Sequence, residues 1–126
     1  MMPVLAPADR RVPMIATADI GKEIARLLTG GLQGRKIVEL GSRFSANDLA
    51  RAMTEVLGRP VAARPVSRDR WPATLEAIGL APGTTGAYEE MWDGVNSGWI
   101  DFGVPGTEPV AISVTPAQVF AAAKTA

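Results

Sequence analysis

The stretch of residues 36–60, KIVELGSRFSANDLARAMTEVLGRP, constrains the fold more than any other part of the chain. It opens with a short apolar run that a glycine closes, a pattern typical of a β-strand. Ser45 and Asp48 then have the spacing of a capping box, in which each side chain accepts a hydrogen bond from the other residue's backbone N–H. Apolar residues follow at helical spacing as far as Gly58, which suits a left-handed helix end, and Pro60 forbids continuation. The stretch therefore predicts a strand followed by a capped helix.

The rest of the chain extends this pattern. Residues 61–66 are typical of a second strand, which Pro65 places near a sheet edge or strand end. A strand, a helix and a strand with short joints predict a right-handed crossover between parallel strands. Elsewhere the sequence predicts a strand at 12–16, a helix capped by Thr17 and ended by Gly30, a helix from Ser67 to Gly79, a helix opening at Thr84 or Thr85, a short strand at 99–102, a loop at 103–108 and a final helix opened by the capping box of Thr115 and Gln118.

These elements predict one domain over residues 1–126, with residues 1–11 as a tail. The fold class is mixed α/β, with a small, partly parallel sheet and four or five helices. A hydrophobic fraction of 47% is sufficient for a core. No apolar run approaches the roughly 20 residues that a membrane span needs, and the first residues do not resemble a secretion signal. We expect a cytoplasmic protein.

The net charge is zero but unevenly distributed. Residues 1–70 hold 12 Lys and Arg against seven Asp and Glu, giving +5, and residues 71–126 hold one against six, giving −5. This asymmetry suits a solvated surface, and it also leaves open head-to-tail association or an anionic ligand on the first half. The basic residues are scattered and are not grouped with aromatic ones, so we do not expect nucleic-acid binding.

The absence of two residue types limits the chemistry. The chain has no His and no Cys, which excludes Ser–His and Cys–His nucleophile pairs, His-based and Cys-based metal sites, and disulfides. A dinucleotide site needs a glycine-rich turn after a strand and before a helix. Gly30, Gly31 and Gly34 occur in the reverse context, and Gly41-Ser42-Arg43 lacks the repeated glycines. We therefore predict no cofactor-binding residue and no metal ligand.

The remaining polar candidates are also weak. Tyr88 is the only tyrosine, and the position four residues later, where a pKa-lowering Lys would stand, is Trp92. Glu89, Glu90 and Asp93 lie near one another on the predicted helix, a pattern more typical of a solvated face than of acid–base catalysis. We predict no catalytic residue. Large apolar side chains near glycine-rich turns suit either an apolar pocket or an ordinary core.

Three short motifs carry a resemblance to a known family. Residues 17–21 (TADIG), 45–49 (SANDL) and 58–61 (GRPV) occur in the order and spacing of the carboxy-terminal half of NmrA-like proteins, which are atypical short-chain dehydrogenase relatives. The same order is similar to that of sugar-nucleotide epimerases. The resemblance covers roughly residues 12–120 and implies a fold like the C-terminal, substrate-side part of an NAD(P)-binding Rossmann-type protein.

The resemblance implies a pocket wall and no more. In the family, the amino-terminal half binds NADP and holds most of the active site. Because this chain starts with Met, we expect that half to be missing, and no catalytic or nucleotide-binding residue is carried over. The segments near Met14 and near residues 88–99 face the substrate in relatives. The implied pocket candidates are Met14, Tyr88, Met91, Trp92, Asn96 and Trp99.

The missing half also implies a partner. A strand at residues 36–40 would lose its neighbours, and an apolar strand with bare edges is prone to pair with another chain. We expect a homodimer, with or without exchanged elements, or a complex with a separate nucleotide-binding chain. The function expected is non-catalytic binding of an apolar small molecule or of a protein. The alternatives are the substrate lobe of an NAD(P)-dependent oxidoreductase that acts only with that separate chain, and a fragment of such an enzyme.

Overall fold

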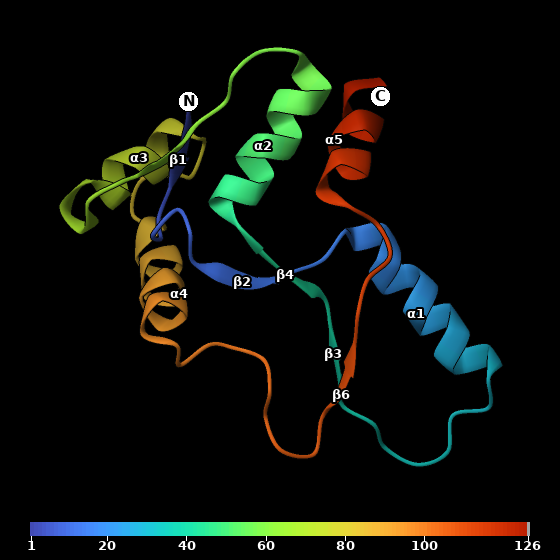
Figure 1. Ribbon diagram of the computed structural model, residues 1–126. Coiled ribbons are helices and arrows are strands. Elements are labelled where there is room, and N and C mark those ends of the chain that lie inside the picture. The colour runs from blue at the N-terminus through green and yellow to red at the C-terminus, as the bar shows by residue number, and fades with distance from the viewer. Residues whose placement is uncertain (126) are drawn as a thin grey trace.

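The structure is a computed structural model that describes residues 1–125, and for Thr125 it describes the backbone alone. Short strands alternate with helices along the chain, and Figure 1 shows β2 and β4 at the centre with helices on either side. The elements in order are β1 (Met2–Val4), β2 (Arg11–Met14), α1 (Thr17–Thr29), β3 (Val38–Leu40), β4 (Ser42–Ser45), α2 (Ala46–Leu57), β5 (Ala63–Pro65), a 3-10 turn (Arg68–Arg70), α3 (Trp71–Ala77), α4 (Thr85–Ser97), β6 (Glu108–Val110) and α5 (Pro116–Thr125). The mixed α/β class is confirmed.

The capping box that opens α2 is present as predicted. The Ser45 hydroxyl accepts a hydrogen bond from the Asp48 backbone N–H at 3.1 Å, and an Asp48 carboxylate oxygen accepts one from the Ser45 N–H at 3.0 Å. Gly58 ends the helix with φ of 66°, in the left-handed region that favours glycine. The capping box of Thr115 and Gln118 opens α5 in the same way. Thr17 does not cap α1, because the helix starts at Thr17 itself and Ala16 occupies the cap position.

The strands form three two-stranded sheets, which differ from the predicted pairing. β1 pairs in parallel with β5, β2 is antiparallel to β4, and β3 pairs in parallel with β6. The predicted crossover between the strands that flank α2 was wrong. After Gly41 the chain continues extended as β4, which pairs with β2, so β3 and β5 find different partners.

Three further segments differ from prediction. Residues 1–11, expected to be a tail, contain β1 and the buried side chain of Leu5. Residues 99–102, expected to be a strand, have no strand partner in the described chain, whereas the expected loop at 103–108 leads into β6. Residues 108–110 form a strand because they pair with β3. The Glu108 N–H donates a hydrogen bond to the Ile37 C=O at 2.9 Å.

The buried core is small. Leu5, Trp71 and Leu75 form its centre, with Val66, Leu80 and Trp92 packed against them. A second contact joins α2 to α5, which lie side by side in Figure 1. The chain exposes 8432 Å² of surface, whereas a compact monomer of its 13.2 kDa exposes roughly 6,400 Å². The excess is about 2,000 Å². The large apolar side chains that are exposed include Ile24, Leu28, Ile37, Ile78, Trp99 and Val104.

None of the helices within residues 1–125 combines the length and the apolar character that crossing a membrane requires.

Candidate functional site: apolar cavities around Met14

The site is built around β2, the strand that leads into α1. β2 lies against β4 in the register Met14 to Ser42, and Pro13 stands opposite Arg43. Side chains alternate between the two faces of a strand, so Val12 and Met14 share a face. Met14 lines three cavities, which are named below by one lining residue each. Met14 is therefore the side chain that these three cavities share.

The Leu75 cavity has a volume of about 430 Å³ and lies between β2, the N-terminal segment and α4. Its wall is almost wholly apolar, and Arg10 is its only charged lining residue among those described. Ligand cavities commonly measure about 300–1,000 Å³ and have mainly apolar walls with few polar groups. The cavity's wall includes Met14, Leu75, Tyr88, Met91 and Trp92.

The Phe102 cavity, of about 420 Å³, adjoins the first one. The two share Val12 and Met14 of β2 and Met91 and Trp92 of α4, so side chains of these two elements border both spaces. The segment that follows α4, called the closing segment here, borders the second cavity with Ile100 and Phe102. Two adjoining spaces with a wall of flexible Met side chains suit an apolar ligand that spans both.

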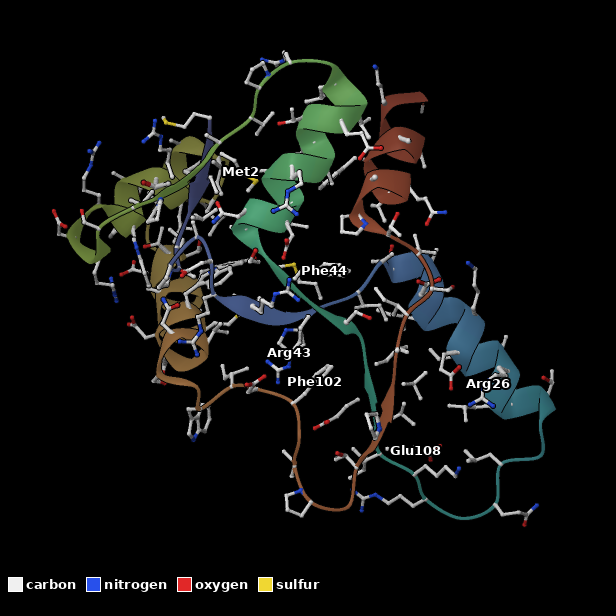
Figure 2. The ribbon with its side chains drawn as sticks, viewed as in Figure 1. Met2, Arg26, Arg43, Phe44, Phe102 and Glu108 are labelled. Carbon is white, nitrogen blue, oxygen red and sulfur yellow. The ribbon has the colours of Figure 1, made fainter. Side chains whose placement is uncertain are left out.

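Hydrogen bonds hold this closing segment in place. Glu39, on β3, accepts hydrogen bonds from the backbone N–H groups of Gly103 at 2.7 Å and Val104 at 3.2 Å. Arg43, on β4, pairs with Asp101 at 2.7 Å. The pKa of Asp101 is lowered, first by the hydrogen bond from Arg43 and second by the backbone N–H of Phe102. Asp101 is therefore held as a carboxylate in an ion pair. Figure 2 shows Arg43, Phe44 and Phe102 close to this part of the structure.

The N-terminal segment is fastened to the end of α4. Arg10 donates to the backbone C=O of Asn96 at 2.7 Å, and the Asn96 side-chain amide donates to the C=O of Leu5 at 2.7 Å. The side-chain oxygen of Asn96 is buried and has no partner. These bonds fix one wall of the Leu75 cavity, and Asn96 itself borders a separate, open hollow beside Trp71.

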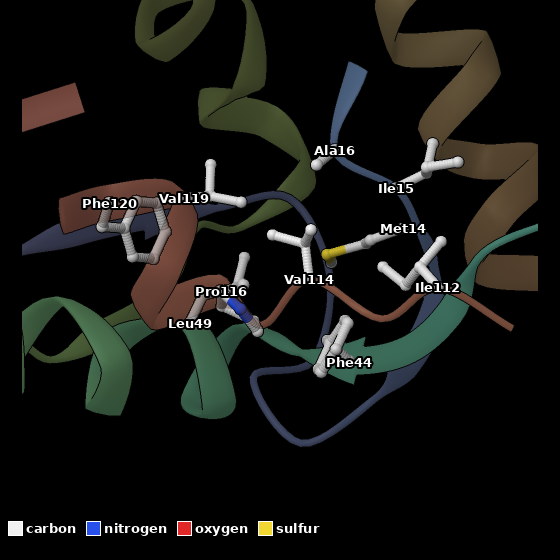
Figure 3. Close-up of a pocket in the computed structure, with 10 residues that line it drawn as sticks. All are labelled: Met14, Ile15, Ala16, Phe44, Leu49, Ile112, Val114, Pro116, Val119 and Phe120. Carbon is white, nitrogen blue, oxygen red and sulfur yellow. The ribbon is translucent and has the colours of Figure 1, made fainter. Parts of the chain in front are cut away.

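The Phe120 cavity is smaller, about 190 Å³, and lies on the α5 side of Met14. Figure 3 shows Met14 between Val114 and Ile112. Phe44 and Leu49 lie on one side of these residues, and Ile15 and Ala16 lie on the other. All ten lining residues are apolar, so this space provides packing between α5 and the β2–β4 pair and no polar contact for a ligand.

The structure brings together four of the six residues that the sequence indicated. Met14, Tyr88, Met91 and Trp92 line the Leu75 cavity, although Tyr88 is half exposed. Asn96 forms the hydrogen bonds described above, which hold the N-terminal segment against the end of α4. Trp99 is 85% exposed and lies outside the cavities described. Sequence reasoning missed Val12, which lies in a correctly predicted strand, and Ile100 and Phe102, whose apolar alternation was visible but was interpreted as strand pairing.

Two of the three carboxylates of α4, those of Glu89 and Asp93, are engaged in ion pairs. Arg68 bonds to both Asp93 and Glu89, and its guanidinium lies 4.7 Å from the centre of the Trp71 ring. These bonds, first to Asp93 and then to Glu89, raise the pKa of Arg68. The cluster attaches α4 to the segment before α3, and it leaves no free acid pair in the cavities. Within the described residues, no group of three or more potential ligands could hold a metal ion.

Comparisons with protein-family models, with curated proteins and with solved structures found no match to this chain.

Proposed function

We propose that this protein is a non-catalytic binding domain whose ligand is an apolar small molecule. The observation that carries the proposal is the pair of adjoining cavities of about 430 and 420 Å³ that share Met14, Met91 and Trp92. The apolar walls of these open spaces face water, and an apolar ligand that fills them removes that apolar surface from water.

The charges of the site support binding over catalysis. Arg10 and Asp101 are the charged residues on the two walls, and both are engaged, Arg10 with Asn96 and Asp101 with Arg43. A general acid or base needs a group with a free position toward the substrate and a pKa near the working pH. The Asp101 pKa is shifted away from that range. The proposal also places the domain in the cytoplasm.

A second candidate function is the substrate lobe of an NAD(P)-dependent oxidoreductase, which the NmrA-like resemblance implies. The observation that favours it is the pairing of β1 with β5 and of β3 with β6, because isolated parallel pairs are uncommon outside larger sheets covered by helices. Under this alternative, a separate nucleotide-binding chain supplies NADP. Both candidates predict that this chain alone binds no NADPH, and only the second predicts NADPH oxidation once the partner chain is added.

Tryptophan fluorescence tests the first proposal with bromobenzene as an apolar, quenching probe. Trp92 lines both cavities, whereas Trp99 is almost fully exposed. We expect saturable quenching in the natural chain. Trp99→Phe removes an exposed fluorophore and serves as the control: it should leave the saturable part unchanged. Trp92→Phe should remove most of it.

The result that contradicts the proposal is quenching that rises linearly with bromobenzene and does not depend on Trp92. Met14→Gln provides a second test, because a polar amide in the shared wall disfavours an apolar ligand. Its circular dichroism spectrum reports whether the fold is kept. If folded Met14→Gln bound bromobenzene with unchanged affinity, the probe would bind at another place in the molecule.

A further inference from the structure

Prolines block most of the strand edges. In β1–β5, the Met2 N–H bonds to the Ala62 C=O, and the Val66 N–H bonds to the Val4 C=O. The backbone N–H and C=O groups of successive residues therefore point alternately toward the partner strand and away from it. The register then turns Pro3 and Pro65 outward. The same alternation turns Pro13 of β2 and Pro109 of β6 outward, since neither has an N–H for its partner strand. An outward proline removes the donor that a further strand would need.

The outer edge of β3 has no such block. The Glu108 N–H bonds to the Ile37 C=O, and Pro109 stands opposite Glu39, so Glu39 is the β3 residue that bonds to β6. The N–H and C=O groups of Val38 and Leu40 therefore point to the opposite edge. No other described strand pairs with β3. The edge offers two donors and two acceptors to an incoming strand.

The helix over this strand is also incompletely covered. Val38 and Leu40 line a space under α1 together with Ile20, Ile24 and Leu27. Side chains of this apolar face remain open: Ile24 is 52% and Leu28 is 72% exposed. Figure 1 shows α1 projecting to the side of the β3–β6 pair, away from the other helices. The open edge and the open helix face therefore belong to one surface.

We infer that a second copy of this chain covers this surface by pairing its own β3 antiparallel to β3, which gives a four-stranded sheet in the order β6, β3, partner β3, partner β6. The excess of about 2,000 Å² per chain is about 4,000 Å² for two chains, which lies within the total of about 2,000 to 5,000 Å² that an obligate homodimer buries. The zero net charge of the chain means that two copies do not repel one another.

The two-fold symmetry explains the exposed face of α1. An axis at right angles to the sheet keeps like faces on the same side, so the two α1 helices lie next to each other and cover Ile24 and Leu28. A register centred on Glu39 would set this carboxylate opposite the partner's Glu39, which is unfavourable. A register centred on Val38 avoids that contact and sets Val38 opposite the partner's Val38.

Proline substitution at the two kinds of edge tests the inference. Val38→Pro removes only the outward N–H, and the bonds of β3 to β6 remain. Ala63→Pro makes the same change on the outer edge of β5, which Pro65 already blocks. By light scattering on the peak from a sizing column, we expect a dimer for the natural chain and for Ala63→Pro. Val38→Pro should raise the dimer dissociation constant at least about tenfold, because two hydrogen bonds are lost per dimer.

A cross-link provides a test that does not depend on how well the proline variant folds. The chain has no cysteine, so Val38→Cys introduces a single thiol. Directly opposed, hydrogen-bonded residues have Cα atoms about 5.5 Å apart, within the range that a disulfide spans. We expect Val38→Cys to become a covalent dimer under mild oxidation, and Ala63→Cys, the matched control, to form no covalent dimer.

A monomeric natural chain would overturn the inference, and so would equal cross-linking of Val38→Cys and Ala63→Cys. A dimer that Val38→Pro leaves intact, with its fold confirmed by circular dichroism, would place the interface elsewhere and would also overturn it. The β3 edge and α1 line neither the Leu75 cavity nor the Phe102 cavity. A failure here is therefore separate from a failure of ligand binding.

Discussion

Replacing Ser45 by Ala removes the group on which the start of α2 depends. The buried Ser45 hydroxyl accepts from the Asp48 N–H at 3.1 Å and donates to an Asp48 carboxylate oxygen at 2.8 Å. Loss of a helix-cap hydroxyl costs about 0.5–2 kcal/mol in the free energy of unfolding. We expect a value in the upper half of that range, about 1–2 kcal/mol, because the hydroxyl is buried and serves two bonds at once.

Urea unfolding followed by circular dichroism measures this cost, and Thr115→Ala is the matched control. Thr115 has the equivalent place in the capping box of α5, but it is exposed, so its loss should cost less. The urea midpoint should fall for Ser45→Ala while the slope stays constant. A Ser45→Ala variant that costs no more than Thr115→Ala would refute the reasoning.

The same capping box predicts an acid dependence. The pKa of Asp48 is lowered, first by the hydrogen bond from the Ser45 backbone N–H and second by the Ser45 hydroxyl. A carboxyl whose pKa is lower in the folded state stabilises the fold above its unfolded pKa of about 3.9. That contribution is lost as the pH falls through the folded pKa. The stability difference between the natural chain and Asp48→Asn should therefore shrink below about pH 4. Parallel acid curves for the two proteins would contradict this.

Two further substitutions test the core and the closing segment. Leu75 is 3% exposed, so Leu75→Ala should cost about 2–5 kcal/mol in unfolding free energy; Ile78 is 64% exposed, and Ile78→Ala should cost under about 1 kcal/mol. Equal urea midpoints would contradict the core assignment. Glu39→Ala removes the acceptor for two backbone N–H groups, so hydrogen exchange at Gly103 and Val104 should accelerate. Unchanged exchange would show that Glu39 does not hold the segment.

The helix ends of this protein could be predicted because they depend on neighbours within about four residues. The boxes of Ser45 with Asp48 and of Thr115 with Gln118, and the left-handed Gly58, all lie within such a span. The pairing of the strands could not be predicted in this way. β1 and β6 have three residues each, and each contains a proline, so their sequences are typical of loops. Only contact with a distant segment makes them strands.

The candidate site follows the same division. Tyr88, Met91 and Trp92 lie on one helix, and their grouping follows from helical spacing. Their position beside Met14 depends on the N-terminal segment, which β1 and the Arg10–Asn96 contact hold against α4. The sequence signal for that contact is absent, since it joins residues 86 positions apart. Contacts with distant segments also decide which aromatic residue after α4 lines a cavity. Phe102 lines one, whereas Trp99, adjacent to the helix end, lies outside the cavities.

The most direct test of the binding function uses the methionine methyl groups as probes. Met14 and Met91 line both large cavities, whereas Met53 lies on α2 and lines neither, and Met1 is exposed. Carbon-13 labelling of the methyl groups, with Met→Leu variants for assignment, gives each residue its own NMR signal. During titration with bromobenzene, we expect saturable shifts of Met14 and Met91 while Met53 and Met1 stay in place. Shifts of equal size at every methionine, or no saturable shift at Met14 and Met91, would contradict the proposal that these cavities bind the ligand.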